Sequence, residues 1–305
     1  MKCFYHLSDM DGWCSAAIVA KFTNNYNKEN YIGIDYNNHK ITDINLSIIE
    51  NGEDVYISDL AFTDETVHIL DTLINKCGDK LIWNDHHKSS IELCKKFTYL
   101  KNIKGLRDSN DSGAFLTWCT LFNGNNMPGA VAYVSDWDCF HFEFGDITRY
   151  FKYGIDQDPW FKFPLSHQWK RLLDIGYNIG HLTHVINVGK ILDRYIKTDY
   201  ETSLKSNAYE TMFAGYKMAV VNRSCNSLIF GELYNKYPIV STFSYDGEKW
   251  KYSLYSSDKS VDCEAIARQF GGGGHKGAAG FASDKLLYKK TASIDFSQLK
   301  EESNE

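Results

Sequence analysis

Residues 81–88 read Leu-Ile-Trp-Asn-Asp-His-His-Lys, a short apolar run that ends in one acid and two histidines. A strand that stops here would place Asp85, His86 and His87 at the carboxyl edge of a sheet. Open α/β sheets bind their ligands outside that edge. The stretch therefore predicts an α/β fold with a polar site at one edge of its sheet.

Three other apolar runs end in acids in the same way. Residues 4–6 lead to Asp9 and Asp11, residues 55–58 lead to Asp59, and residues 131–135 lead to Asp136. If these edges meet in the fold, their side chains form one cluster of histidine and aspartate. The expected members of this cluster are His6, Asp9, Asp11, Asp59, His86 and Asp136.

The first part of the chain alternates between strand-like and helix-like segments. This alternation is typical of a mainly parallel sheet flanked by helices. Strands are expected at residues 2–6, 31–36, 54–58 and 80–84, and helices at residues 15–22, 64–76 and 114–122. The run after Pro128 could form a helix or a strand, and residues 140–180 show only an irregular, aromatic-rich pattern.

The rest of the chain reads as a helical connector followed by a smaller α/β domain. A helix is expected over residues 182–212, followed by further strands and helices. The predicted division is residues 1–180 for the first domain, 181–212 for the connector, 213–290 for the second domain and 291–305 for a frayed tail.

Composition narrows the class of protein. The net charge of −6 over 305 residues disfavours a protein that wraps long nucleic acid with a broad basic surface. No signal-peptide pattern or long apolar run is present, so a cytoplasmic protein without membrane spans is expected. The eight cysteines form no C-x-x-C pair, which argues against a zinc ribbon.

The expected cluster has the donor set of a divalent metal site. Imidazole and carboxylate ligands suit Mn²⁺, Fe²⁺ or Mg²⁺, and converging carboxylates would repel one another without a cation. A shared carboxylate can hold two ions that activate water and stabilise a phosphoryl displacement. Asp59, alone at the end of its strand, is the natural bridge. No serine or cysteine nucleophile is then needed.

A glycine-rich run near the C-terminus predicts a second kind of site. Residues 271–280 read Gly-Gly-Gly-Gly-His-Lys-Gly-Ala-Ala-Gly, which lets the backbone approach an anion closely. Arg268, one helical turn earlier, could add a bidentate phosphate contact. The predicted substrate contacts in this part of the chain are Asn222, Tyr255, Ser256, Arg268, Gly272, Gly273, Gly274, His275 and Lys276. Trp13 and Trp137 could stack on bases, although buried core positions are the simpler interpretation.

These motifs, in this order, resemble the DHH phosphoesterase superfamily with its C-terminal DHH-associated domain. The quoted residues are Asp9-x-Asp11-Gly12, Asp59, Asp85-His86-His87, Asp136 and the glycine run. The resemblance covers nearly the whole chain, and the short length is most similar to the oligoribonuclease branch, the NrnA and NrnB nanoRNases. It implies two Mn²⁺ ions in a cleft between the domains, and cleavage of phosphate ester bonds in small nucleotides.

The resemblance also implies a role for each site residue. His6, Asp9 and Asp59 would hold one metal, and Asp11, Asp59, His86 and Asp136 the other. His87 would face the substrate phosphate, and Asp85 would orient the catalytic cluster from behind. Asp138 could replace Asp136 or support it, but a solvent-facing acid is the simpler interpretation.

The predicted function is hydrolysis of short oligonucleotides to mononucleotides, and several alternatives stay open. The same metal motifs suit a cyclic di- or oligonucleotide phosphodiesterase that degrades a signalling or defence nucleotide, or a 3′-phosphoadenosine phosphatase. A nucleotide sensor without turnover is the alternative from another class. A homodimer is compatible with each, and long DNA is not an expected partner.

Overall fold

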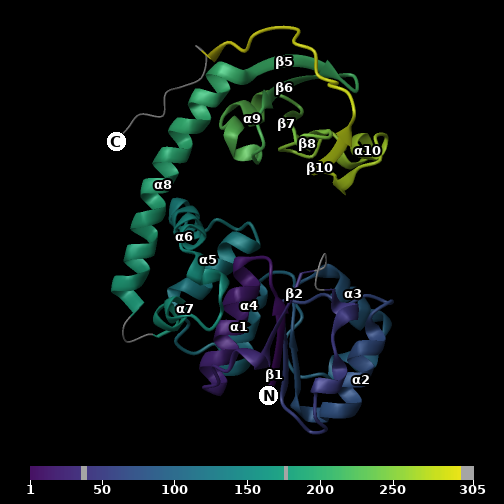
Figure 1. Ribbon diagram of the computed structural model, residues 1–305, viewed down its shortest axis with the longest axis vertical. Coiled ribbons are helices and arrows are strands. Elements are labelled where there is room, and N and C mark those ends of the chain that lie inside the picture. Colours follow the sequence, from purple (N-terminus) through teal and green to yellow (C-terminus); the bar gives the residue numbers. More distant parts are fainter. Residues whose placement is uncertain (36–39, 175–177, 297–305) are drawn as a thin grey trace. The chain divides into compact units, whose positions relative to one another are not determined.

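The computed structural model of the chain describes residues 1–35, 40–174 and 178–296. It divides into two compact units, Met1–Asp193 and Arg194–Glu305. Figure 1 labels the elements of each unit. Within the described ranges, no helix combines the length and the apolar character that a membrane crossing would require.

The first unit is built on a parallel sheet of four strands. These are β1 (Lys2–His6), β2 (Tyr31–Ile34), β3 (Val55–Ser58) and β4 (Leu81–Asn84), in the order β2-β1-β3-β4. The chain passes from β1 to β2 on one side and returns to β3 on the other. The switch point between β1 and β3 is where such sheets form a ligand crevice. The predicted parallel sheet is confirmed.

Both faces of this sheet are covered by helices (Figure 1). On one face, Phe4 and Trp83 pack with α2 (Val67–Cys77) and α3 (Lys88–Lys96). On the other face, Cys3 and Tyr5 belong to a core that includes Phe151 and Ile155 of α6 (Asp146–Gln157), Val185 of α8 (Asn178–Asn207) and residues of four further helices. Those helices are α1 (Met10–Thr23), α4 (Gly113–Phe122), α5 (Gly129–Asp138) and α7 (His167–Leu172). Alternation of side chains along β1 therefore supplies two separate cores.

Helices occupy two segments that the sequence left open or irregular. The run after Pro128 is a helix, α5, and residues 140–180 contain α6 (Asp146–Gln157) as well as α7. Thr148, Phe151 and Ile155 are buried along α6, at the spacing of one helical face. The exposed aromatic residues that flank α6 obscured this period in the sequence. α8 covers Asn178–Asn207.

Short 3₁₀ helices lie at Lys28–Asn30, Ile41–Asp43, Leu46–Ile48, Gly78–Lys80, Thr98–Asn102, Pro159–Lys162 and Ser227–Phe230.

Glycines bring α6 and α8 into close contact, which gives a first prediction. A Cβ added at Gly189 would lie 1.6 Å from the Tyr150 carbonyl oxygen. We expect Gly189→Ala to lower the free energy of unfolding by about 3 kcal/mol, because the helices must separate. Gly180 in the same helix faces open space. Because alanine favours a helix more than glycine does, Gly180→Ala should raise the free energy of unfolding by about 1 kcal/mol. Urea unfolding of both variants checks the pair, and equal effects would contradict the described packing.

The second unit is a mixed sheet of six strands in the order β5-β6-β7-β8-β10-β9. Its strands are β5 (Ala208–Phe213), β6 (Tyr216–Asn222), β7 (Val240–Tyr245), β8 (Trp250–Tyr255), β9 (Gly273–His275) and β10 (Ala278–Ser283). Only the β6–β7 pair is parallel among them. The helix predicted through residue 212 ends at Asn207, because the following six residues pair with β6 as a strand.

The six-stranded sheet also has a core on each face. Val220 and Leu254 pack with α10 (Cys263–Arg268), and Val221 and Val240 pack near α9 (Leu233–Lys236). The α/β fold class predicted for both parts of the chain is therefore confirmed.

Candidate functional site

The first acids of the site lie where β1 passes into α1. Asp9 caps the helix, because its Oδ1 accepts a hydrogen bond from the Gly12 amide at 3.0 Å. The helix begins at Met10, five residues earlier than expected, so Asp11 lies within its first turn. A Cβ on Gly12 would lie 1.9 Å from the His6 carbonyl oxygen. Glycine at this position is thus required for the helix to start against the strand end.

Asp59 follows β3 and lies between two imidazoles. Its Oδ2 is 3.4 Å from His6 Nδ1, and its Oδ1 is 3.3 Å from His86 Nε2. The side chain is 1% exposed, and its backbone φ is 57°, in the left-handed region. Burial opposes ionisation, but the two imidazoles outweigh it and lower the pKa of Asp59 to about 2. Asp59 is therefore a buried carboxylate with one oxygen directed at each histidine.

His86 lies among three carboxylates. Its Nε2 is 3.3 Å from Asp59 Oδ1, 3.3 Å from Asp138 Oδ2 and 3.9 Å from Asp11 Oδ2. Burial opposes the imidazolium, but Asp59, Cys139 and Asp11 raise the pKa of His86 to about 12. The surrounding acids therefore favour a positive charge at this position, which a bound cation would supply in place of a proton on His86.

The acids around His86 also repel one another. Burial raises the pKa of Asp11, and the neighbouring carboxylates of Asp59 and Asp138 raise it further. Burial and Asp59 likewise raise the pKa of Asp138 to about 6. A cation among these groups would remove this repulsion.

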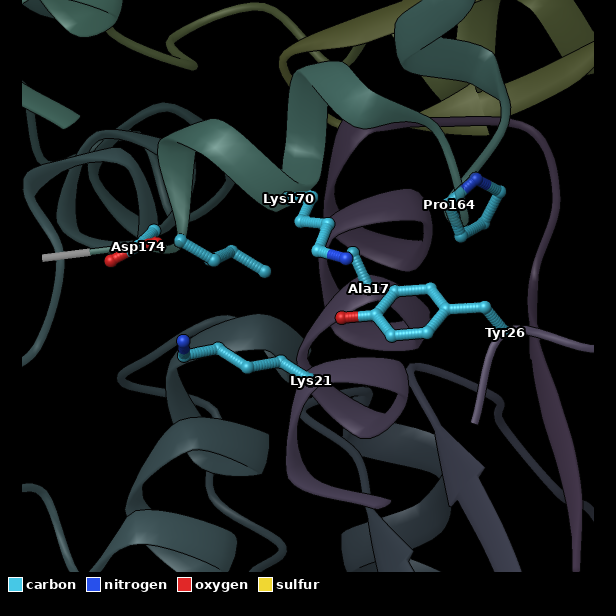
Figure 2. Close-up of a pocket in the computed structure, with 7 residues that line it drawn as sticks. Ala17, Lys21, Tyr26, Pro164, Lys170 and Asp174 are labelled. Atoms are coloured by element: carbon cyan, nitrogen blue, oxygen red, sulfur yellow. The ribbon is translucent and has the colours of Figure 1, made fainter. Parts of the chain in front are cut away.

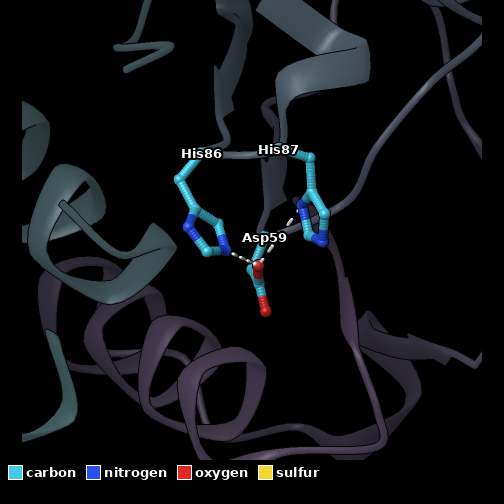
Figure 3. A group of neighbouring side chains, drawn as sticks. All are labelled: Asp59, His86 and His87. Carbon is cyan, nitrogen blue, oxygen red and sulfur yellow. Dashed lines mark ion pairs between the residues drawn. The ribbon is translucent and has the colours of Figure 1, made fainter. Parts of the chain in front are cut away.

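Figure 3 shows His86 and His87 extending from one turn toward Asp59. The ring of His87 is held by Asp85. The fully buried Asp85 lies 2.7 Å from His87 Nδ1, and Asp59 Oδ1 lies 3.8 Å from the same nitrogen. Burial lowers the pKa of His87, but Asp85 outweighs it and raises the pKa overall. Because a carboxylate accepts, Nδ1 donates, and Asp85 fixes the direction in which the ring presents Nε2.

The donor atoms fit a divalent metal site. Among the described residues, three groups have donor atoms within 4.8 Å of one another: His6, Asp9 and Asp59; Asp59, His86 and His87; and His86, Asp138 and Cys139. Neither oxygen of the buried Asp59 accepts a hydrogen bond of regular geometry in the described part of the chain. A buried carboxylate without such a bond is costly unless a cation binds it. The predicted convergence of His6, Asp9, Asp11, Asp59 and His86 is therefore found in the structure.

Asp136 lies apart from this group, which differs from the expectation. Its Oδ1 accepts a hydrogen bond from the Glu143 amide at 2.7 Å, and its Oδ2 accepts from the Phe144 amide and the Thr148 hydroxyl. Asp138, two residues later in α5, is the acid that reaches His86. It lies one helical turn after the buried Val134. In a helix, residues four apart share a face and residues two apart do not. Recognition of residues 129–138 as a helix therefore distinguishes Asp138 from Asp136.

The start of α4 closes the site and gives a second prediction. The amides of Gly113 and Ala114 donate to Asp11 at 2.7 and 2.8 Å. A Cβ on Gly113 would lie 2.6 Å from that of Asp59. We expect Gly113→Ala to displace Asp59 and to lower turnover by about a hundredfold. Steady-state kinetics checks this, with Gly180→Ala as the control, and wild-type turnover in the Gly113→Ala protein would contradict the described contact.

The glycine run forms a hairpin at the edge of the second sheet. β9 pairs with β10, with His275 opposite Ala278. A Cβ on Gly272 would lie 2.1 Å from the Gly280 carbonyl oxygen, so this glycine is needed for close backbone packing. Gly273, Gly274, His275 and Lys276 are exposed or partly exposed on the hairpin. Arg268 is held by Glu264, with its Nε 2.9 Å from Oε1.

The remaining predicted contacts differ in accessibility. Asn222 is exposed at the end of β6, and Tyr255 is partly buried at the end of β8. Ser256 is 3% exposed, and its hydroxyl donates to the Pro238 carbonyl at 3.0 Å. Its hydroxyl is therefore engaged within the protein, and substrate contact at Ser256 stays a prediction from the sequence. Trp13 is buried in the core and donates to the Leu7 carbonyl, so it is not a base-stacking surface.

A separate hollow of about 60 Å³ lies between α1 and α7 (Figure 2). Its polar lining includes Lys21, Tyr26 and Lys170, with Lys170 Nζ 4.7 Å from the Tyr26 ring centre. Lys21 lies ten residues beyond Asp11, about 15 Å along the helix axis. The hollow is too small for a nucleotide, whose pockets measure roughly 300 Å³ or more. The histidine and aspartate group is thus the better candidate site.

Comparisons with known proteins agree with this organisation. The DHHA1 domain family matches residues 211–299. Uncharacterized protein R106 of Acanthamoeba polyphaga mimivirus is 25% identical over 225 residues, which cover 70% of this chain and 50% of that protein. The chain therefore spans about half the length of this curated relative.

Two solved structures extend the comparison to nearly the whole chain. The pGpG-specific phosphodiesterase PggH from Vibrio cholerae is 11% identical, with a TM-score of 0.54 over 93% of this chain and 92% of that one. An exopolyphosphatase-related protein from Bacteroides fragilis is 13% identical, with a TM-score of 0.43 over 93% and 87%. The first of these likenesses establishes a shared fold. Residues 211–299 thus match the DHHA1 domain family, and the chain shares its fold with PggH.

Proposed function

We propose that this chain is a metal-dependent phosphodiesterase that hydrolyses short oligonucleotides to mononucleotides. The position of Asp59 carries the proposal. One of its oxygens faces His6 and the other faces His86, and the carboxylate is almost completely buried. A carboxylate shared in this way between two donor groups is the arrangement that a pair of divalent ions requires.

We assign the residues that would hold two ions from the contacts between their side chains. His6, Asp9 and Asp59 form the first group, and Asp11, Asp59, His86 and Asp138 form the second. Asp138 takes the place that the sequence suggested for Asp136. These donors suit Mn²⁺, with Mg²⁺ or Fe²⁺ as alternatives. Divalent ions in such a site lower the pKa of water and neutralise charge on phosphate oxygens.

We assign binding of the substrate phosphate to side chains of the chain as well as to the ions. His87 is 34% exposed, whereas the Asp85 that holds its Nδ1 is fully buried. We assign His87 Nε2 to the substrate phosphate, with Asp85 fixing the ring. We assign the exposed hairpin with His275 and Lys276 to the binding of one end of the substrate.

The substrate class is proposed from charge and fold together. A net charge of −6 disfavours long nucleic acid, and PggH, which shares the fold, is described as pGpG-specific. Short linear oligonucleotides are therefore the preferred substrates. Cytoplasmic location and a homodimer remain predictions from the sequence.

A matched panel of substrates tests the proposal. Purified protein with Mn²⁺ would be assayed on pApA, pGpG, a five-residue RNA, long single-stranded DNA, cyclic dinucleotides and 3′-phosphoadenosine phosphate. We expect rapid release of mononucleotide from the dinucleotides and little action on long DNA. Opening of cyclic compounds while pApA and pGpG are spared would instead identify a cyclic nucleotide phosphodiesterase. Absence of hydrolysis across the panel would favour a sensor.

A further inference from the structure

An exposed aromatic loop begins directly beside the candidate metal site. Asp138 lies 3.3 Å from His86, and Cys139 has a donor atom within 4.8 Å of the same histidine. The next residue, Phe140, is 74% exposed, and Phe142 is 42% exposed. Consecutive Cα atoms are 3.8 Å apart, so Phe140 lies within about 8 Å of Asp138. That separation is comparable to the span from phosphate to base within one nucleotide.

The rings in this loop are held in a fixed arrangement. The ring centres of Phe140 and Phe142 are 6.0 Å apart, and the Phe142 and Trp137 ring centres are 5.8 Å apart. Phe144 packs with Tyr133 at 5.1 Å. Phe142 thus packs on the partly buried Trp137, Phe140 packs on Phe142, and both phenylalanines leave surface open to solvent.

The backbone of the loop takes an unfavourable conformation to present these rings. Phe140 has a φ of 56° and Phe142 a φ of 53°, a region that bulky residues rarely adopt. Such conformations persist where the surroundings fix them, and they gather at ligand sites. Asp136 holds this backbone in place. Its carbonyl oxygen accepts hydrogen bonds from the His141 and Phe142 amides, and its carboxylate accepts hydrogen bonds from the Glu143 and Phe144 amides.

We propose that Phe140 and Phe142 form a stacking surface for the nucleobase of a substrate whose phosphate binds at His87 and the ions that Asp59, His86 and Asp138 would hold. The proposal rests on the function proposed above and assigns the residues that would recognise the base of its substrate. Exposed apolar rings beside a polar site mark a binding surface. Aromatic stacking on a base raises affinity by roughly 5- to 150-fold. Asp136 then acts as a positioning residue for this surface.

Replacement of each phenylalanine by asparagine tests the surface without adding strain. Asparagine adopts the left-handed conformation readily, so Phe140→Asn and Phe142→Asn remove a ring while keeping the backbone. Binding of AMP and of ribose 5-phosphate to the Mn²⁺-loaded protein would be measured by calorimetry. We expect wild-type protein to prefer AMP, and each variant to lose 5- to 150-fold in AMP affinity with ribose 5-phosphate unchanged.

Two further variants serve as controls. Phe140→Trp keeps a ring and should retain the AMP preference, whereas Phe163→Ala removes a phenylalanine that is 58% exposed elsewhere and should change nothing. Loss of the ring without loss of AMP affinity, with dinucleotide hydrolysis intact, would overturn the stacking surface alone. A ring-dependent AMP preference in protein that hydrolyses no dinucleotide would overturn the proposed function alone.

Discussion

Asp59→Asn is expected to lower turnover of a dinucleotide by about a thousandfold or more, equal to about 4 kcal/mol of transition-state stabilisation. Asp59 is the residue that both histidines contact, and it is buried. Asparagine has nearly the same shape and accepts the positive φ found here. The change therefore removes the charge that would be shared between two ions while the backbone is preserved.

Kinetics and metal binding should change together in this variant. Calorimetry with Mn²⁺ should show fewer ions bound or much weaker binding, and circular dichroism should show the wild-type fold. Asp79→Asn, which removes an exposed acid of the same unit, is the control. Full turnover in folded Asp59→Asn protein would refute the shared-ligand role.

The second large effect separates two acids that are only two residues apart. Asp138→Asn should weaken Mn²⁺ binding and lower turnover about a hundredfold or more, with little change in melting temperature. Asp136→Asn should instead lower the free energy of unfolding by about 2 kcal/mol, because a buried carboxylate that accepts several hydrogen bonds is replaced by an amide.

Metal binding and thermal stability are measured for both variants. Metal binding should fall in Asp138→Asn, and stability should fall in Asp136→Asn. Thermal unfolding reports the hydrogen bonds that hold residues 143–148, and metal titration reports the donor group. If Asp136→Asn lost metal binding at unchanged stability while Asp138→Asn bound normally, the assignment from the structure would be reversed.

The sequence by itself determined the class of the fold and most of the candidate site. Apolar runs that end in acids required strands whose carboxyl ends meet, because parallel strands place these ends at one edge. This placed His6, Asp9, Asp11, Asp59 and His86 together, and the structure brings them together. Local signals sufficed here because each residue lies within a few positions of a strand end.

Tertiary structure decided which acid completes the group and what the glycine run becomes. Asp136 and Asp138 have the same chemistry and neighbouring positions, so only the helical rotation of α5 separates them. Gly273–His275 becomes a strand because β10 pairs with it, and the helix expected to reach residue 212 stops where β5 pairs with β6. Strand pairing and helix rotation depend on contacts between residues distant in sequence, and no local pattern of side chains contains them.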